Sequence, residues 1–233
     1  MLATAMHMPG AGPSIGRAWI KANAIAAAVF AATGLLVIVG DRILSIGDPV
    51  TDPLVRAIAA AVYFVATLAG LVAYATLIGG ALNRKLPAFP WLGWSALHIG
   101  FGVALGALAA ATVLLNNVPA GEVVPTAMPK SKAVMALIVF TGIAVGSVMG
   151  AVVGGLQAVV LRKAARGVGA WIGWSTVAGV VLALSFLAVA FYMAHAAPGR
   201  GLTQDLVFEA IAFFGTMIGA VVMLPAVSRL RAR

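Results

Sequence analysis

The feature that most constrains the fold of this chain is a series of six long apolar runs. A helix needs about 20 mostly apolar residues to cross the hydrocarbon core of a bilayer. Every run reaches that length, and prolines, glycines and charged residues separate the runs. The sequence therefore predicts an all-α, polytopic membrane protein, a bundle of six transmembrane helices at about 19–40, 54–82, 91–118, 133–161, 171–197 and 206–227.

Composition supports a membrane protein. Of the 233 residues, 63% are hydrophobic and 9% are charged, whereas a soluble domain has about 25% charged residues. The chain has no cysteine, which excludes disulfides, zinc-thiolate sites and cysteine nucleophiles. The connections between the runs are short and leave no room for a soluble catalytic domain. We expect three parts: a tail at 1–18, a transmembrane domain at 19–228 and a basic C-terminus at 229–233.

Positive charge is concentrated at one set of helix ends, and all six acidic residues lie toward the other set. Cytoplasmic connections carry an excess of Lys and Arg. This asymmetry predicts a multi-pass protein with both termini cytoplasmic. Nucleic-acid binding is not expected, because no connection combines a basic patch with aromatic platforms. The basic ends carry Arg17, Lys21, Arg84, Lys85, Arg162, Lys163, Arg166, Arg229, Arg231 and Arg233.

All five tryptophans fall at the same basic helix ends. Tryptophan favours the headgroup level of a bilayer, where its ring is apolar and its N–H can reach water. The pattern therefore predicts a one-sided aromatic belt at the membrane interface. Its members are Trp19, Trp91, Trp94, Trp171 and Trp174.

The segment WLGWS at 91–95 recurs as WIGWS at 171–175, and Gly70 matches Gly150 at the same offset. In both copies a helix leads into a short basic connection, and Trp-x-x-Trp opens the next helix. We predict that the second and third helices and the fourth and fifth helices are duplicated hairpins of one orientation, as in parallel-repeat transporters. Convergence of two helix starts on the same interface residues is the alternative.

The second copy, within residues 150–175, resembles a pattern found in uncharacterised bacterial multi-pass membrane proteins. In that pattern Gly-x-x-Gln is followed by a Leu-Arg pair and by a Trp at the start of the next helix. An aromatic residue often follows the Gln, and here Ala158 stands in its place. The resemblance implies a membrane fold and no particular activity, and together with the composition it predicts a protein of the bacterial inner membrane. Its positions are held by Gln157, Leu161, Arg162 and Trp171.

Glycine recurs at every fourth position in the fourth apolar run, at Gly142, Gly146, Gly150 and Gly154. In a soluble helix each glycine costs roughly 1 kcal/mol relative to alanine, but in a bilayer small residues allow two helices to pack closely. This glycine zipper predicts a helix-packing surface, within the chain or between subunits, that is either static or a sliding or gating surface. The candidate partners are Gly102 with Gly106 and Gly215 with Gly219.

His98 is the histidine best placed to bind a haem or chlorin. His195 lies toward the far end of the fifth run, and at 1.5 Å per residue the two differ in depth by roughly 25 Å. The two histidines therefore cannot ligate one haem. The alternative is that His98 is hydrogen-bonded between helices, and on that basis neither a cofactor nor a metal is expected.

No combination of residues typical of a catalytic site is present. The sequence lacks His-Glu-x-x-His, Gly-x-Ser-x-Gly and phosphate-loop motifs. No charged residue lies near the middle of a predicted helix, which counts against ion-coupled transport. We expect a non-enzymatic accessory or scaffold subunit that packs in the lipid bilayer against other membrane proteins or a second copy. The alternatives are a uniporter or exporter of a small uncharged or lipid-like solute, and haem or chlorin binding through His98.

Overall fold

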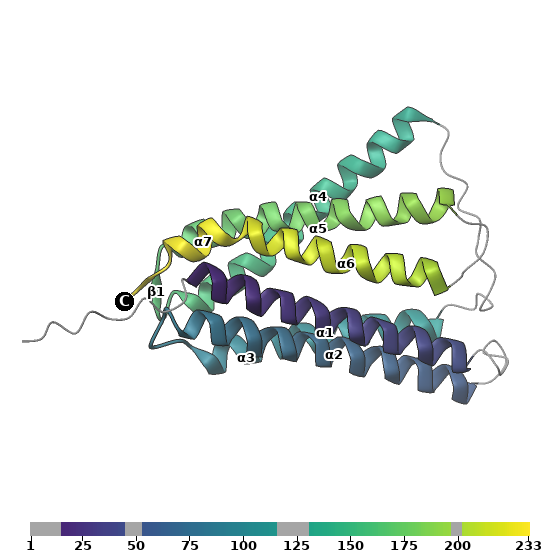
Figure 1. Ribbon diagram of the computed structural model, residues 1–233, viewed down its shortest axis with the longest axis horizontal. Helices are drawn as coiled ribbons and strands as arrows, with labels where there is room; N and C mark the ends of the chain where they lie inside the picture. The colour runs from purple at the N-terminus through teal and green to yellow at the C-terminus, as the bar shows by residue number, and fades with distance from the viewer. Residues whose placement is uncertain (1–14, 45–52, 116–130, 197–201) are drawn as a thin grey trace, which may run out of the picture.

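The computed structural model describes residues 15–44, 53–115, 131–196 and 202–233. It is a helical bundle (Figure 1), with two two-residue strands, β1 (Ala165–Arg166) and β2 (Arg231–Ala232), at one end. Within the described residues, α1 to α5 are long and apolar enough to cross a membrane, which indicates a membrane protein. The helices are α1 (Ile15–Leu44), α2 (Pro53–Asn83), α3 (Trp91–Leu115), α4 (Lys132–Leu161), α5 (Val168–Ala196), α6 (Leu202–Val222) and α7 (Leu224–Arg229).

The predicted helical bundle is confirmed in this coarse form, while the number of membrane spans remains a prediction. The predicted run at 206–227 is interrupted at Met223, between α6 and α7. Pro225 accounts for the interruption, because proline has no N–H and its ring collides with the carbonyl four residues earlier. In addition, α1 begins inside the predicted tail, at Ile15, and α5 begins at Val168, immediately after the turn at Gly167.

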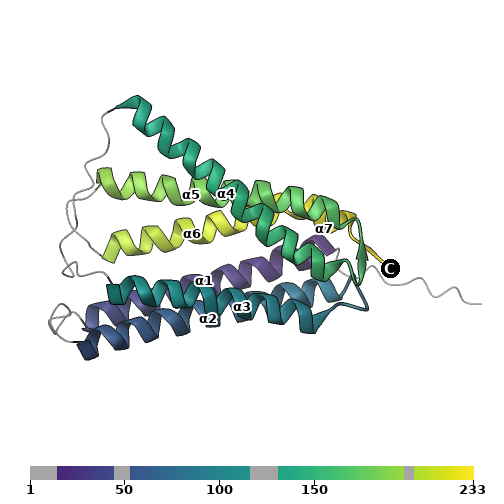
Figure 2. The ribbon, with the colours of Figure 1, turned by 180° about the vertical axis from the view of Figure 1, so that it is seen from behind.

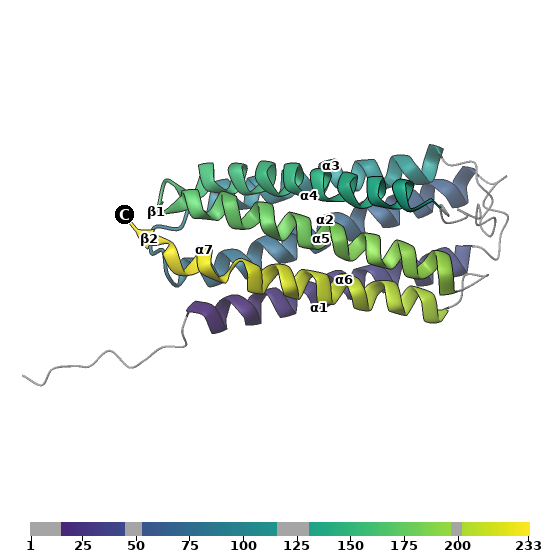
Figure 3. The same ribbon diagram turned by 90° about the horizontal axis from the view of Figure 1, so that it is seen from above.

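The helices follow one another around an open arc in the order α3, α2, α1, α6, α5, α4. Neighbours in this order pack along their lengths, but α3 and α4, the two ends of the arc, touch only sparsely. Seen from in front and from behind, α4 leans away from the bundle toward its N-terminal end (Figures 1 and 2). Seen from above, α1 to α6 run roughly along the long axis of the bundle (Figure 3). The gap between α3 and α4 is therefore closed at one end of the bundle, and it is open at the other end, toward which α4 leans away.

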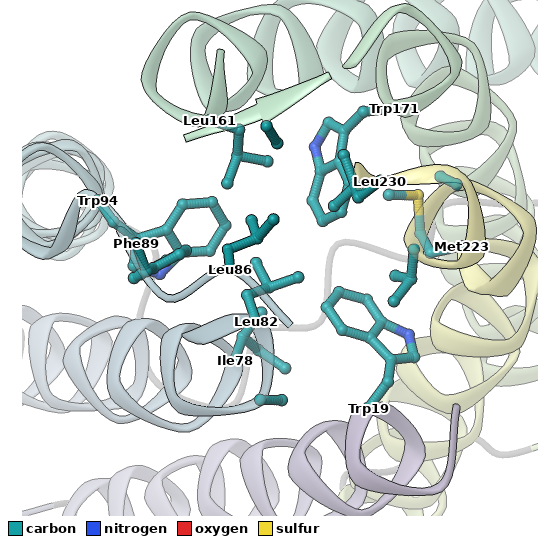
Figure 4. Packing of buried hydrophobic residues seen from close by; sticks show 14 of the residues in the cluster. Trp19, Ile78, Leu82, Leu86, Phe89, Trp94, Leu161, Trp171, Met223 and Leu230 are labelled. Atoms are coloured by element: carbon teal, nitrogen blue, oxygen red, sulfur yellow. The ribbon is translucent and has the colours of Figure 1, made fainter. Parts of the chain in front are cut away.

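Most of the fully buried side chains gather at this closed end, which is also the basic end. Figure 4 shows them pointing toward one another from α1, α2, α3, α4, α5 and the C-terminal segment. Elsewhere large apolar side chains remain exposed, for example Leu108 and Phe140 at 62% and 69%. Lipid tails would cover such side chains in a bilayer. The core includes Trp19, Ile78, Leu82, Leu86, Phe89, Trp94, Leu161, Trp171, Met223 and Leu230.

A C-terminal clamp, residues 164–167 with 229–233, holds the basic end together. The antiparallel strands β1 and β2 place Ala165 opposite Ala232 and Arg166 opposite Arg231. The backbone N–H of Arg233 also donates to the carbonyl of Ala164, at 3.1 Å. The predicted C-terminal tail is therefore ordered by pairing with the connection between α4 and α5.

Lys85 ties the connection between α2 and α3 to the same clamp. Its Nζ donates to the carbonyls of Val227 and Ser228, at 2.7 and 2.8 Å. These carbonyls lie in the last turn of α7, where a cation also interacts favourably with the helix dipole. Burial, and after it the positive charge of Arg231, lower the pKa of Lys85 below its ordinary value.

Gly167 is the residue of the clamp whose backbone requires glycine. It has φ +80°, and a Cβ at this position would lie 2.7 Å from the carbonyl oxygen of Arg229. Gly167→Ala is expected to lower the free energy of unfolding by about 2 kcal/mol, because a side chain in the left-handed region alone costs roughly 1–2 kcal/mol. Thermal unfolding in detergent measures the change. Gly169→Ala is the control, since nothing lies within 4 Å of its added Cβ, and equal losses in both variants would contradict this explanation.

Candidate functional site

A chain of hydrogen bonds joins α3, α4 and α5 inside the core at the basic end. The indole N–H of Trp171 donates to Oε1 of Gln157 at 3.0 Å, and Nε2 of Gln157 lies 3.2 Å from Nε2 of His98. Nδ1 of His98 lies 2.8 Å from the carbonyl oxygen of Trp94. His98 and Gln157 are only 2% and 6% exposed. We call His98, Gln157 and Trp171 the polar chain.

The partners determine the tautomer of the histidine. Because Trp171 takes the amide oxygen of Gln157, the amide nitrogen must donate to His98. His98 then accepts at Nε2 and carries its proton on Nδ1, which donates to the carbonyl of Trp94. Every link in the polar chain thus has one donor and one acceptor, and the imidazole is neutral.

Helix geometry places these residues together. His98 follows Trp94 by four residues, so its Nδ1 reaches the carbonyl one turn earlier on the same helix. Gln157 lies in the last turns of α4, and Trp171 lies in the first turn of α5. The short connection between these two helices returns the chain at the same depth. The ring of His98 also packs against Trp94 and Tyr74, with ring centroids 4.4 and 5.6 Å apart.

This environment bears on the haem or chlorin hypothesis. Both ring nitrogens of His98 are engaged in hydrogen bonds, so neither offers a free lone pair to a metal. Axial ligation through Nε2 would break the bond to Gln157 inside a packed core. Among the described residues, no group of three His, Asp or Glu side chains could hold a metal ion. The geometry favours the alternative of a histidine hydrogen-bonded between helices.

The predicted tryptophan belt needs correction, because three of its five members are in the core. Their indole N–H groups have protein acceptors, for example the carbonyls of Ala220 and Ala75, which Trp19 and Trp94 reach at 2.9 and 3.0 Å. Trp91 is 38% exposed and Trp174 is half-buried, so these two stay compatible with an interface position. The buried members, each at most 1% exposed, are Trp19, Trp94 and Trp171.

The glycine stripe of α4 packs against α5 within the chain. A Cβ on Gly146 would lie 2.6 Å from the carbonyl oxygen of Gly179. A Cβ on Gly150 would collide with the carbonyl oxygen of Ser175 and lie 2.9 Å from Cα of Thr176. The two backbones are therefore in direct contact. The other two members, Gly142 and Gly154, face Leu187 and Ser175.

The predicted partners of this stripe were wrong. A Cβ on Gly102 would lie 2.7 Å from Cδ1 of Leu68 in α2, and one on Gly106 would lie 3.0 Å from Cδ2 of Phe64. Gly215 faces α5, and nothing lies within 4 Å of a Cβ on Gly219. Consecutive helices joined by short connections usually pack side by side, so α3 pairs with α2 and α4 pairs with α5.

No protein-family model, no curated protein and no solved structure matches this chain. The duplicated hairpin remains a prediction. Both α2–α3 and α4–α5 are hairpins, but matched positions differ in their surroundings: Trp91 is 38% exposed and Trp171 is 1% exposed. Likewise, Gly70 faces Phe30 of α1, whereas Gly150 faces α5.

Sequence reasoning did not assign Gln157 a role, although it is the centre of the polar chain. One signal was available: an amide in an apolar run, at about the same distance from the basic end as His98. Two further buried polar contacts were not predicted. Nδ2 of Asn23 donates to the carbonyl of Trp19 at 2.9 Å, and Oγ of Ser175 lies 3.7 Å from Sδ of Met223.

Proposed function

We propose that this chain is a non-enzymatic integral membrane protein, an accessory or scaffold subunit that packs against other membrane-protein subunits. We assign it to the bacterial cytoplasmic membrane with six spans. We place both termini in the cytoplasm because the basic helix ends carry no acidic residue. The chain also lacks a recognisable catalytic motif, which supports a structural role.

The observation that carries the proposal is an uncovered small-residue face on α3. Ala96, Gly100 and Ala104 follow one another at four-residue spacing, and all three are exposed. A Cβ on Gly100 would meet nothing within 4 Å, whereas Gly102, about 200° around the same helix, is in tight contact with α2. Transmembrane helices associate through small residues at such spacing. One small-residue face of α3 thus packs within the chain, and the opposite face is open to a partner.

Gly100→Leu is expected to leave the bundle folded but to release the partner, because the leucine would keep the partner helix away from the α3 backbone. Native mass spectrometry of the protein released gently from its own membrane measures the complex. Gly173→Leu is the matched control, since Gly173 is an exposed helical glycine with nothing within 4 Å of an added Cβ. A Gly100→Leu protein that kept its partner would remove this face from the proposal.

The wild-type protein in the same experiment tests the proposal as a whole. Recovery together with other subunits supports it, and recovery of the chain alone would overturn it. The second candidate, a carrier of a small uncharged or lipid-like solute, would then lead. It is favoured by one observation: the arc is open between α3 and α4, which belong to two separately packed hairpins. Solute flux in proteoliposomes would test it.

A further inference from the structure

Three basic residues from distant parts of the chain lie at or beside the C-terminal clamp. The register of β1 and β2 places Arg166 directly opposite Arg231, and opposite residues in an antiparallel pair have Cα atoms about 4.5–5.5 Å apart. Lys85 joins them, because its Nζ is bound to the last turn of α7 and lies close enough to Arg231 to be affected by its charge. We call Lys85, Arg166 and Arg231 the basic cluster.

No aspartate or glutamate of the described segments balances this cluster. The segments that form this end of the bundle, residues 15–24, 76–100, 154–176 and 215–233, contain no Asp or Glu. Like charges directly opposite each other in a strand pair are destabilising. Lys85 does not relieve the crowding, because it is itself a cation and uses two of its three donors on carbonyls. The clamp therefore concentrates positive charge that no Asp or Glu side chain of these segments neutralises.

The position of the cluster indicates which anion could neutralise it. Arg166 and Arg231 are exposed, and the planar donor fork of a guanidinium matches the oxygens of a phosphate. The cluster also lies within a few residues of the ends of α2, α4 and α5, at Asn83, Leu161 and Val168. If these helices cross a bilayer, the two arginines lie at the depth of the lipid headgroups.

We propose that Arg166 and Arg231, supported by Lys85, bind the phosphate of an anionic phospholipid in the leaflet at the basic end. The lipid neutralises the like-charge pair and so stabilises the C-terminal clamp. A lipid headgroup, rather than free phosphate, is the proposed ligand, because the helices hold the basic cluster at the membrane surface. The proposal requires only that the helices cross a membrane, and it does not depend on whether α3 docks a partner subunit.

Titration of the purified protein with phosphatidylglycerol or phosphatidylcholine, followed by native mass spectrometry, tests the site. Each basic residue near an anionic surface contributes about fivefold in affinity, so R166Q/R231Q should weaken phosphatidylglycerol binding about 25-fold. R166K/R231K keeps the charge but loses the guanidinium fork, so its affinity should lie between those of R166Q/R231Q and the wild type. K130Q/K132Q, which removes the same charge from sequence positions outside the basic cluster, should change the phosphatidylglycerol affinity less than twofold. Equal phosphatidylglycerol affinity in R166Q/R231Q and the wild type would overturn the proposal.

Thermal unfolding in nanodiscs provides the second readout. In phosphatidylcholine, R166Q/R231Q should unfold at or above the wild-type temperature, because the repulsion is gone. In phosphatidylglycerol, the wild type should gain stability and R166Q/R231Q should not. Inorganic phosphate added to phosphatidylcholine nanodiscs should not reproduce the gain, and full reproduction would overturn the lipid assignment. If the double variant did not fold, R231Q alone would replace it. Its phosphatidylglycerol affinity, measured by native mass spectrometry, should fall about fivefold.

Discussion

Gly150→Ala is expected to lower the free energy of unfolding by about 3 kcal/mol, at the upper end of the cost of overpacking a core. The added methyl group would collide with the carbonyl oxygen of Ser175 and lie 2.9 Å from Cα of Thr176. Both are backbone atoms, which a rotamer change cannot move. The only relief is separation of α4 from α5, which would also disturb the contacts of Gly146 and Gly154.

Gly155, five residues further along α4, provides the control for this prediction. Nothing lies within 4 Å of a Cβ added at Gly155, so Gly155→Ala should leave the unfolding temperature unchanged or slightly raised, as expected for alanine in a helix. Gly146→Leu combined with Gly150→Leu should prevent folding or assembly altogether. Unfolding in detergent, monitored by circular dichroism, compares the variants. Equal behaviour of Gly150→Ala and Gly155→Ala would show that α4 and α5 do not pack through this stripe.

Gln157→Leu is expected to lower the free energy of unfolding by roughly 2–4 kcal/mol. The substitution leaves Nε2 of His98 and the indole N–H of Trp171 without partners in the core, and each unsatisfied buried group costs roughly 1–3 kcal/mol. The effect should be large although the leucine is about the size of the glutamine. Unfolding in detergent, monitored by circular dichroism, gives the change in the free energy of unfolding.

Two variants separate the loss of hydrogen bonds from a general packing defect. Combining Gln157→Leu with His98→Phe removes both sides of one link and should recover part of the loss, because replacing both partners by apolar groups is nearly neutral. Thr176→Val should change stability by less than about 0.5 kcal/mol, since this exposed hydroxyl bonds only to Ile172 of its own helix. Nitrogen NMR of His98 offers a direct check: a proton on Nε2 in the wild type would contradict the polar chain.

The helices themselves could be predicted because the constraint on them is local. An apolar run of this length must satisfy its backbone hydrogen bonds internally, and a helix does so. The predicted runs at 54–82 and 133–161 accordingly lie within one residue of α2 (Pro53–Asn83) and α4 (Lys132–Leu161). The glycine spacing likewise predicted that α4 has a packing face, since the preference for small residues at close crossings can be inferred from one helix.

Pairing and burial could not be predicted in the same way. Helices that are apolar on every side have no amphipathic stripe to show which face turns inward. For that reason the sequence predicts an interface position for Trp19, Trp94 and Trp171, whereas the structure buries them in the core. The strands β1 and β2 are too short for an alternating pattern, and Arg166 and Arg231 lie far apart in the sequence.

The amino-acid sequence is enough to predict the kind of element, its approximate length and the separation of charge between the two sets of helix ends. These properties depend on each residue's own solvation and backbone preference. Only the folded structure shows that α4 packs on α5, that Gln157 joins His98 to Trp171, and that the basic segments come together at one clamp. Those outcomes depend on distances between residues distant in the chain, because side chains at such separations interact only after the helices have packed.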